Sequence, residues 1–186
     1  MSSTSGFRTS ILGLVADPIR EAHRQWAAHG WEGAADGMAL VTSVVRAHQL
    51  LLERIDTVLR PLGLSFARYE VLRLLGFTRT GALPMTRLGS LLQVHPTSVT
   101  SAVARLEKQG YVARSRGEPD RRIVLASITD EGRTIVEKAT EGLNDVVFAR
   151  PGIPADQVVA LTTLLTGLRA AAGDPVAPVD PATAGT

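Results

Sequence analysis

The sequence contains no cysteine, and aromatic side chains are scarce, with two Trp, two Tyr and four Phe among 186 residues. Without a thiol, the chain can form no disulfide, no thiolate metal site and no thiol redox switch. Long hydrophobic runs are also missing, since the longest, such as 160–168, are interrupted by Thr and Gly. Nothing therefore resembles a membrane span, and the Ser- and Thr-rich start lacks the layout of a signal peptide. We expect a cytoplasmic protein that does not bind membranes.

Sequence motifs of the common catalytic sites are absent as well. There is no GxSxG, no HExxH and no phosphate-binding glycine loop. His23 and His29 are six residues apart, which does not place both on one helical face, and no carboxylates cluster with them at metal-ligand spacing. A catalytic function is one alternative, but no nucleophile and base come together in a recognisable pattern. We therefore expect no enzyme, no metal and no cofactor.

Two short helices joined by a tight turn are predicted over 87–92 and 96–109. Leucines at helical spacing mark the first helix, and Thr86 is a candidate for its N-cap. Pro96 suits the first position of the second helix, and Gly110 suits its end. The pair has the form of a helix-turn-helix.

The second of these helices has two distinct faces. Val99, Val103 and Leu106 recur at intervals of four and three residues and must point into a core. The opposite face carries hydroxyl and basic side chains, namely Thr97, Ser98, Thr100, Ser101, Arg105 and Lys108. Short hydroxyl side chains allow close approach to base edges, and the basic side chains can meet phosphates. These six residues, called the reading face below, predict a helix that reads duplex DNA.

After this helix the pattern changes to β-branched and aromatic residues over 111–115 and 122–128, on either side of a polar turn at 116–121. This pattern predicts a β-hairpin with an exposed tip, and Leu83 is expected to add a short strand against it. A helix-turn-helix with such a hairpin is a winged helix. Residues 86–129 contain seven Arg or Lys and three acids, a net charge of +4 against +2 for the whole chain. This concentration of positive charge is expected of a surface that binds duplex DNA.

This region resembles the MarR family of winged-helix regulators. Residues 99–112 are similar to the family's recognition helix and the start of its wing, and residues 120–132 are similar to its wing signature and the next helix. The resemblance covers roughly 38–170 and is most specific over 86–132. His95 departs from it, because the family usually has a better helix N-cap there, such as Ser. The N-terminal extension before residue 36 is a second departure. Without cysteine, the chain cannot use the thiol-based peroxide sensing of some family members.

In the wing, Arg116, Arg121 and Arg122 are expected to contact DNA, together with Asp120. The resemblance implies that Asp120 orients an arginine, Arg122 above all, towards the minor groove. The alternative is a structural Asp–Arg pair that only stiffens the turn.

Helices are expected on both sides of the winged helix. Asp17-Pro18 is a strong helix start, and Gly30 and Gly33 are expected to end that helix. The apolar residues between 36 and 62 form a heptad-like seam, which predicts one long and largely buried scaffold helix. Beyond the wing, Thr129 is expected to cap a further helix. That helix has the apolar stripe Ile135, Ala139, Leu143 and Val146, and a last helix has the stripe Val158, Leu161, Leu165 and Leu168.

The expected fold class is mainly α with a small β-hairpin wing, a winged helix-turn-helix flanked by long dimerisation helices. The expected segments are a flexible N-terminus (1–16), N-terminal scaffold and dimerisation helices (17–62), a DNA-binding lobe (63–129), C-terminal dimerisation helices (130–173) and a disordered tail (174–186). The apolar stripes favour a homodimer, although packing within one subunit would give the same pattern. Such a dimer would bind a palindromic operator in double-stranded DNA as a transcriptional regulator, and we expect a repressor.

The resemblance further implies a small aromatic or phenolic effector that releases the DNA. Residues outside the winged helix with flat or hydrogen-bonding side chains suited to such a ligand are Trp26, Trp31, His23, His48 and Tyr69. His48 is the sharpest candidate because it interrupts the apolar seam, although a core histidine bonded to a carbonyl is the other interpretation. The alternative function is an effector-independent winged helix that binds protein or packages DNA.

Overall fold

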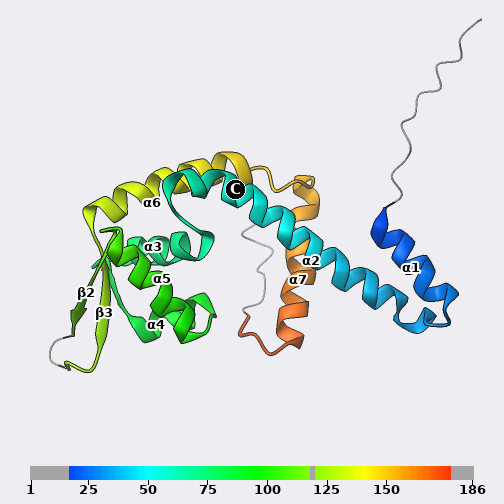
Figure 1. Ribbon diagram of the computed structural model, residues 1–186, viewed down its shortest axis with the longest axis horizontal. Coiled ribbons are helices and arrows are strands. Elements are labelled where there is room, and N and C mark those ends of the chain that lie inside the picture. The colour runs from blue at the N-terminus through cyan, green and yellow to red at the C-terminus, as the bar shows by residue number, and fades with distance from the viewer. Residues whose placement is uncertain (1–16, 118–119, 177–186) are drawn as a thin grey trace, which may run out of the picture. The chain divides into compact units, whose positions relative to one another are not determined.

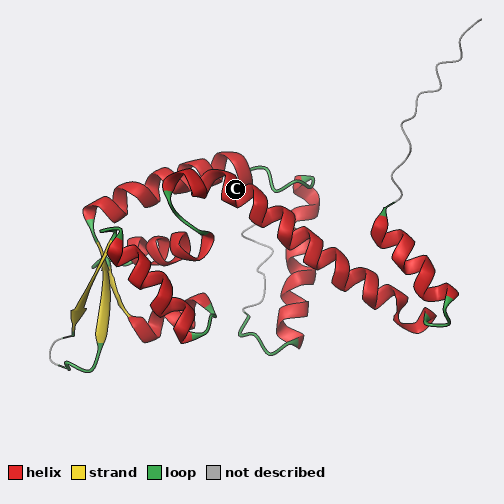
Figure 2. Cartoon of the chain, in the orientation of Figure 1, coloured by secondary structure: helices red, strands yellow, loops and turns green. Residues whose placement is uncertain are grey.

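The computed structural model describes residues 17–117 and 120–176 (Figure 1). The described part of the chain divides into two compact units, with the boundary between Leu51 and Leu52. The predicted fold class is confirmed, because helices dominate and the strands form one small sheet (Figure 2). The elements are α1 (Pro18–Ala28), α2 (Glu32–Leu59), the 3₁₀ turn η1 (Arg60–Leu62), α3 (Phe66–Phe77), β1 (Ala82–Pro84), α4 (Met85–Leu92), α5 (Pro96–Lys108), β2 (Val112–Arg116), β3 (Val124–Ile128), α6 (Asp130–Leu143), the π-helical turn η2 (Asn144–Phe148) and α7 (Ala155–Ala171). None of the helices within the described ranges combines the length and hydrophobicity that a bilayer crossing demands.

The first unit contains α1 and most of α2. Asp17 caps α1 as predicted, since its Oδ1 accepts a hydrogen bond from the Ile19 N–H at 3.0 Å. The prediction that Gly33 helps to end this helix is wrong. Gly30 lies in the turn with φ +82°, whereas Gly33 already belongs to α2, which begins at Glu32. Any residue is tolerated in the first turn of a helix, so glycine there was a weak signal of a break.

The apolar seam of α2 is less buried than its periodicity indicates. Val41 and Val45 are 62% and 52% exposed, whereas Ile55 and Leu59 belong to the core. The expectation of a largely buried helix is therefore correct only for its last two turns. Periodicity reveals an apolar face, but it does not reveal whether that face packs within the same subunit.

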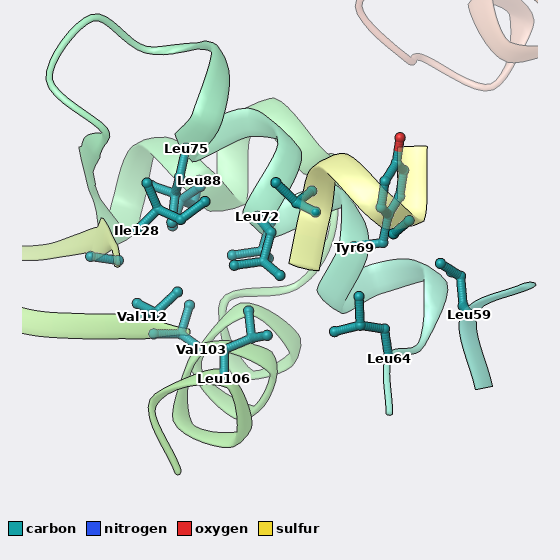
Figure 3. Packing of buried hydrophobic residues seen from close by; sticks show 14 of the residues in the cluster. Leu59, Leu64, Tyr69, Leu72, Leu75, Leu88, Val103, Leu106, Val112 and Ile128 are labelled. Atoms are coloured by element: carbon teal, nitrogen blue, oxygen red, sulfur yellow. The ribbon is translucent and has the colours of Figure 1, made fainter. Parts of the chain in front are cut away.

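The second unit has its core between α3, α4, α5, α6 and the sheet (Figure 3). Leu72, Leu88, Val103 and Leu106 are fully buried, as the spacing of the helical leucines and valines predicts. The sheet is antiparallel with strand order β1-β3-β2. The short strand expected at Leu83 is confirmed, because Leu83 is paired with Ala126 of β3.

Thr129 joins the end of α5 to the start of α6. Its Oγ1 accepts a hydrogen bond from the Gly132 N–H at 3.0 Å, which confirms the predicted cap, and donates one to the Gly110 carbonyl at 2.7 Å. A Cβ on Gly132 would overlap the carbonyl oxygen of Tyr111. Glycine at this position therefore allows α6 to begin in direct contact with the segment that leads into the wing.

The end of α6 differs from the prediction by one residue. The chain forms the π-helical turn η2, so that Val147 is buried and Val146 is 47% exposed. A π-turn inserts one extra residue per turn and shifts the apolar stripe along the sequence. The side chain of Arg54 in α2 secures this turn, donating to the carbonyls of Val146 at 2.8 Å and Pro151 at 3.0 Å, and also to that of Arg150.

The expected flexible N-terminus, 1–16, lies outside the described residues, as does most of the expected disordered tail. The first residues of that tail, 174–176, are described and make contacts. Arg169 near the end of α7 binds Asp174 at 2.7 Å and also donates to Oε1 of Gln93 at 3.0 Å. The end of α7 therefore contacts the turn of the helix-turn-helix.

Candidate nucleic-acid interface

The helix-turn-helix consists of α4 and α5. The expected cap at Thr86 is wrong, because α4 begins at Met85, two residues before the predicted start at 87, with Pro84 at the cap position. Gln93 ends α4 in the left-handed conformation, with φ 53°. His95 then caps α5, its Nδ1 accepting from the Thr97 N–H at 3.3 Å. An imidazole nitrogen therefore takes the role that a serine hydroxyl has in a typical cap.

All six residues of the reading face are exposed, and the opposite face of α5 is buried. Thr100 donates its hydroxyl hydrogen to the Pro96 carbonyl at 3.0 Å, and the Thr97 hydroxyl lies 3.1 Å from His95 Nδ1. Within the described ranges, the hydroxyls of Ser98 and Ser101 have no hydrogen-bond partner. These two serines can therefore donate or accept without first breaking an internal bond.

The wing is the hairpin of β2 and β3, and residues 118–119 at its tip are not described. The Asp120 carboxylate accepts from the backbone N–H of Arg122 at 2.9 Å, and the Ile123 N–H donates to the Asp120 carbonyl at 3.2 Å. Asp120 therefore shapes the turn through the main chain. In the described part of the hairpin, none of the exposed Arg116, Arg121 and Arg122 forms an ion pair.

An ion pair that the sequence did not predict connects α5 to the wing. Arg114 of β2 binds Glu107 of α5, with 2.8 Å between its Nε and Oε2. Hydrogen bonding to Arg114 lowers the pKa of the Glu107 carboxyl. The pair neutralises an acid that would otherwise repel phosphates beside the reading face. Its partners are seven residues apart on different elements, so no local pattern could have revealed it.

Comparisons with known proteins agree with this geometry. Residues 64–124 match the model of the MarR family. The crystal structure of Sco5413, a MarR family transcriptional regulator from Streptomyces coelicolor, is 44% identical with a TM-score of 0.68, and the match covers 75% of this chain and 99% of that one. The chain belongs to the MarR family of transcriptional regulators.

Other MarR-like relatives are more distant. Sco3205 from Streptomyces coelicolor, a MarR family regulator whose structure was determined in complex with DNA, is 26% identical with a TM-score of 0.65, over 74% of this chain and 88% of that one. The organic hydroperoxide resistance transcriptional regulator of Bacillus subtilis strain 168 is 33% identical over 84 residues, 45% of this chain and 56% of that protein. The chain therefore spans only about half the length of that relative.

Three of the candidate effector residues of this MarR protein lie together in the first unit. The rings of Trp26 and Trp31 meet edge-on with 5.4 Å between their centroids, and His29 stacks on Trp31 at 5.8 Å. His23 lies on the same helix as Trp26 and binds Asp36 of α2, with 2.8 Å from Nε2 to Oδ1. Trp26 is half-buried, whereas Trp31 is 54% exposed. Trp26, His29 and Trp31 form a small aromatic cluster at the turn between α1 and α2.

The other two candidates, His48 and Tyr69, lie on other elements. His48 is exposed on α2, 17 residues after Trp31, which corresponds to about 25 Å along a helix axis. The interpretation of His48 as a core histidine is therefore wrong for the subunit. Tyr69 is only 6% exposed within the core of the second unit, and its hydroxyl lies 3.2 Å from Thr140 Oγ1. Its ring packs in the interior and is not a free surface for a ligand.

Proposed function

We propose that this MarR protein is a sequence-specific transcriptional repressor that inserts α5 into the major groove of an operator. The observation that carries the proposal is the exposed reading face of α5, which combines two unengaged serine hydroxyls with Arg105 and Lys108. Hydroxyl groups close to base edges supply sequence readout, and basic groups further along the helix supply phosphate contacts. The wing adds arginines that no acid neutralises among the described residues, which suits the narrow minor groove.

We further propose that the operator is a palindrome and that the protein binds it as a homodimer. One winged helix reads a half-site, and two-fold symmetry places two recognition helices about 34–36 Å apart, one turn of the duplex. The apolar surface of α7 supports this proposal, because Leu164 is 72% and Leu168 49% exposed. Exposed leucines on one helix are typical of a protein interface. A monomer in sedimentation, both free at micromolar concentration and on DNA, would refute the dimer.

The test of DNA binding is genomic footprinting followed by titration of the protected duplex at several salt concentrations. We expect one short protected palindrome and an affinity that falls steeply with salt. A protein that only packages DNA would protect no preferred site, and a protein-binding winged helix would protect none at all. Either of these results would establish the alternative function.

Arg122→Ala tests the wing. Loss of this contact should weaken operator binding by about 1–3 kcal/mol while the fold stays intact. Arg24→Ala is the matched control, because Arg24 is an exposed arginine of α1 that is already paired with Glu21 at 2.6 Å. Equal affinities of the two variants would assign Arg122 a structural role only.

We also propose that a small aromatic or phenolic compound releases the DNA, with Trp26, Trp31 and His23 as the candidate contacts and His48 as a separate one. To weaken DNA binding a hundredfold, an effector needs about 2.7 kcal/mol of preference for the released conformation. The test is a panel of phenolic acids in an operator-release assay, repeated with Trp26→Ala and His48→Ala. A releasing compound that acts equally on the wild type and both variants would place the effector elsewhere.

A further inference from the structure

A hollow of about 390 Å³ lies between the start of α3 and α5, and part of the reading face lines it. Its polar lining consists of Ser65, the residue before α3, of Arg68 from α3, and of Thr97, Ser98, Ser101 and Arg105 from α5, and the remaining two lining residues are alanines. No acidic residue lines it. Two guanidinium groups and four hydroxyls, with no carboxylate, are a set of donors suited to a phosphate oxygen.

Arg68 is held in place by neutral partners. Its Nε donates to Ser65 Oγ at 3.2 Å, and its NH1 donates to Gln109 Oε1 at 3.0 Å. Gln109 is itself anchored, because its Nε2 donates to the Gly63 carbonyl at 3.0 Å. The guanidinium is therefore oriented before any ligand arrives, and its positive charge remains uncompensated in the described part of the chain.

Other arginines in this unit are used differently. Arg114 is paired with Glu107, and Arg73 is paired with Glu137 at 2.9 Å. Those two ion pairs join neighbouring elements of the fold and leave little net charge. An arginine that is braced only by amide and hydroxyl oxygens keeps both its charge and a fixed direction, which is what recognition of an anion requires.

We propose that this hollow binds one phosphate of the operator backbone, with Arg68 as its principal contact and Arg105 on the opposite wall. The inference rests on the proposed DNA binding. Four residues belong both to the hollow and to the reading face, namely Thr97, Ser98, Ser101 and Arg105. A duplex that lies along α5 therefore brings its backbone to the hollow. A contact from α3, outside the helix-turn-helix, fixes the position of α5 on the duplex and carries no sequence information itself.

The experiment replaces single phosphates of the operator by neutral methylphosphonates, one position at a time, and measures the affinity of wild type and Arg68→Ala. For wild type we expect a loss of about tenfold at one position per half-site, in the range of a single charged contact. The Arg68→Ala protein should be insensitive at that position alone and unchanged in its profile elsewhere. Its preference for operator over scrambled duplex should equal that of wild type, while its affinity for both falls.

Salt dependence supplies a second readout that a merely structural role would not change. Two lost phosphate contacts per dimer should reduce the slope of log affinity against log salt by about 1.8. Arg68→Lys keeps the charge without the two-point bracing and should retain most of the slope. Arg24→Ala, with its arginine in α1, should leave slope and profile unchanged. Circular dichroism and thermal unfolding of each variant would identify a loss of affinity caused by a loss of fold.

Three outcomes would overturn the inference while leaving the proposed function intact. The first is an identical methylphosphonate profile for wild type and Arg68→Ala. The second is a changed base preference in Arg68→Ala, which would make Arg68 a base-reading residue. The third is saturable binding of inorganic phosphate to the free protein that disappears in Arg68→Ala while the operator affinity of this variant equals that of wild type, which would identify a free anion as the occupant. Absence of any protected operator for wild type would instead refute the proposed function.

Discussion

The hydroxyl of Thr129 offers a direct test of how the DNA-reading elements are joined to the rest of the protein. Thr129→Val keeps the shape of the side chain but removes the hydrogen bonds to Gly110 and Gly132, of 2.7 and 3.0 Å. Loss of a helix N-cap costs about 1 kcal/mol. A donor or acceptor left without a partner in a partly buried position costs about 1 kcal/mol or more. We expect the variant to lose about 2 kcal/mol of its free energy of unfolding.

The assay is urea unfolding followed by circular dichroism at one fixed protomer concentration, because the stability of a dimer depends on concentration. With a denaturant slope of about 2 kcal/mol per M, the midpoint should fall by about 1 M urea and the slope should not change. Thr129→Ser is the matched control, because serine keeps the hydroxyl and loses only a methyl group. Equal midpoints for the Val and Ser variants would refute the reasoning, since the hydroxyl would then contribute nothing.

Further variants test the core, the close backbone contact and the surface charges. Leu106→Ala should cost about 2–5 kcal/mol in the same urea assay, because Leu106 is fully buried beneath the reading face. Gly132→Ala should destabilise the protein strongly, because the added Cβ overlaps a backbone carbonyl. Gly37→Ala adds a Cβ that meets nothing within 4 Å and should stabilise α2 by about 0.5–1 kcal/mol. Equal urea midpoints for these two variants would contradict both expectations. Hydrogen bonding to Arg73 lowers the pKa of the Glu137 carboxyl below its usual 4.5. The contribution of this ion pair to the free energy of unfolding is therefore complete above pH 4.5 and is lost as the pH falls through the lowered pKa. As the pH falls below 4.5, the free energy of unfolding of Glu137→Gln in the urea assay should therefore decrease less than that of wild type. Parallel curves of this free energy against pH for the two proteins would contradict the ion pair.

The sequence predicted the winged helix because its signals are local. The faces of α5 follow from the spacing of Val99, Val103 and Leu106, all of which are buried. The wing is predicted by a change of periodicity around a polar turn. The role of Thr129 as a helix cap is predicted by its place before two acidic residues. Each of these signals depends on residues within one or two turns of each other, and tertiary packing did not override them.

What the sequence did not predict depends on residues far apart in the chain. No local pattern singles out Arg68, because Gln109, which holds its guanidinium, lies 41 residues later. Tyr69 was proposed as a ligand contact because its ring and hydroxyl suit one, yet Thr140, 71 residues later, lies within hydrogen-bond distance of that hydroxyl. The type of residue was informative in both cases. The partner of each residue could be identified only from the fold, which brings distant segments of the chain together.

Arg54 has a consequence for the order in which this protein folds. Its three carbonyl partners lie 92 to 97 residues further along the chain, and the whole winged helix is encoded between them. Closing so long a loop costs entropy before any contact is gained, so we expect these bonds to form late, after the folding transition state. Interactions that form after the transition state slow unfolding without accelerating folding. The turn between α6 and α7 would thus set the lifetime of the folded subunit, while the DNA-reading elements set how quickly it forms.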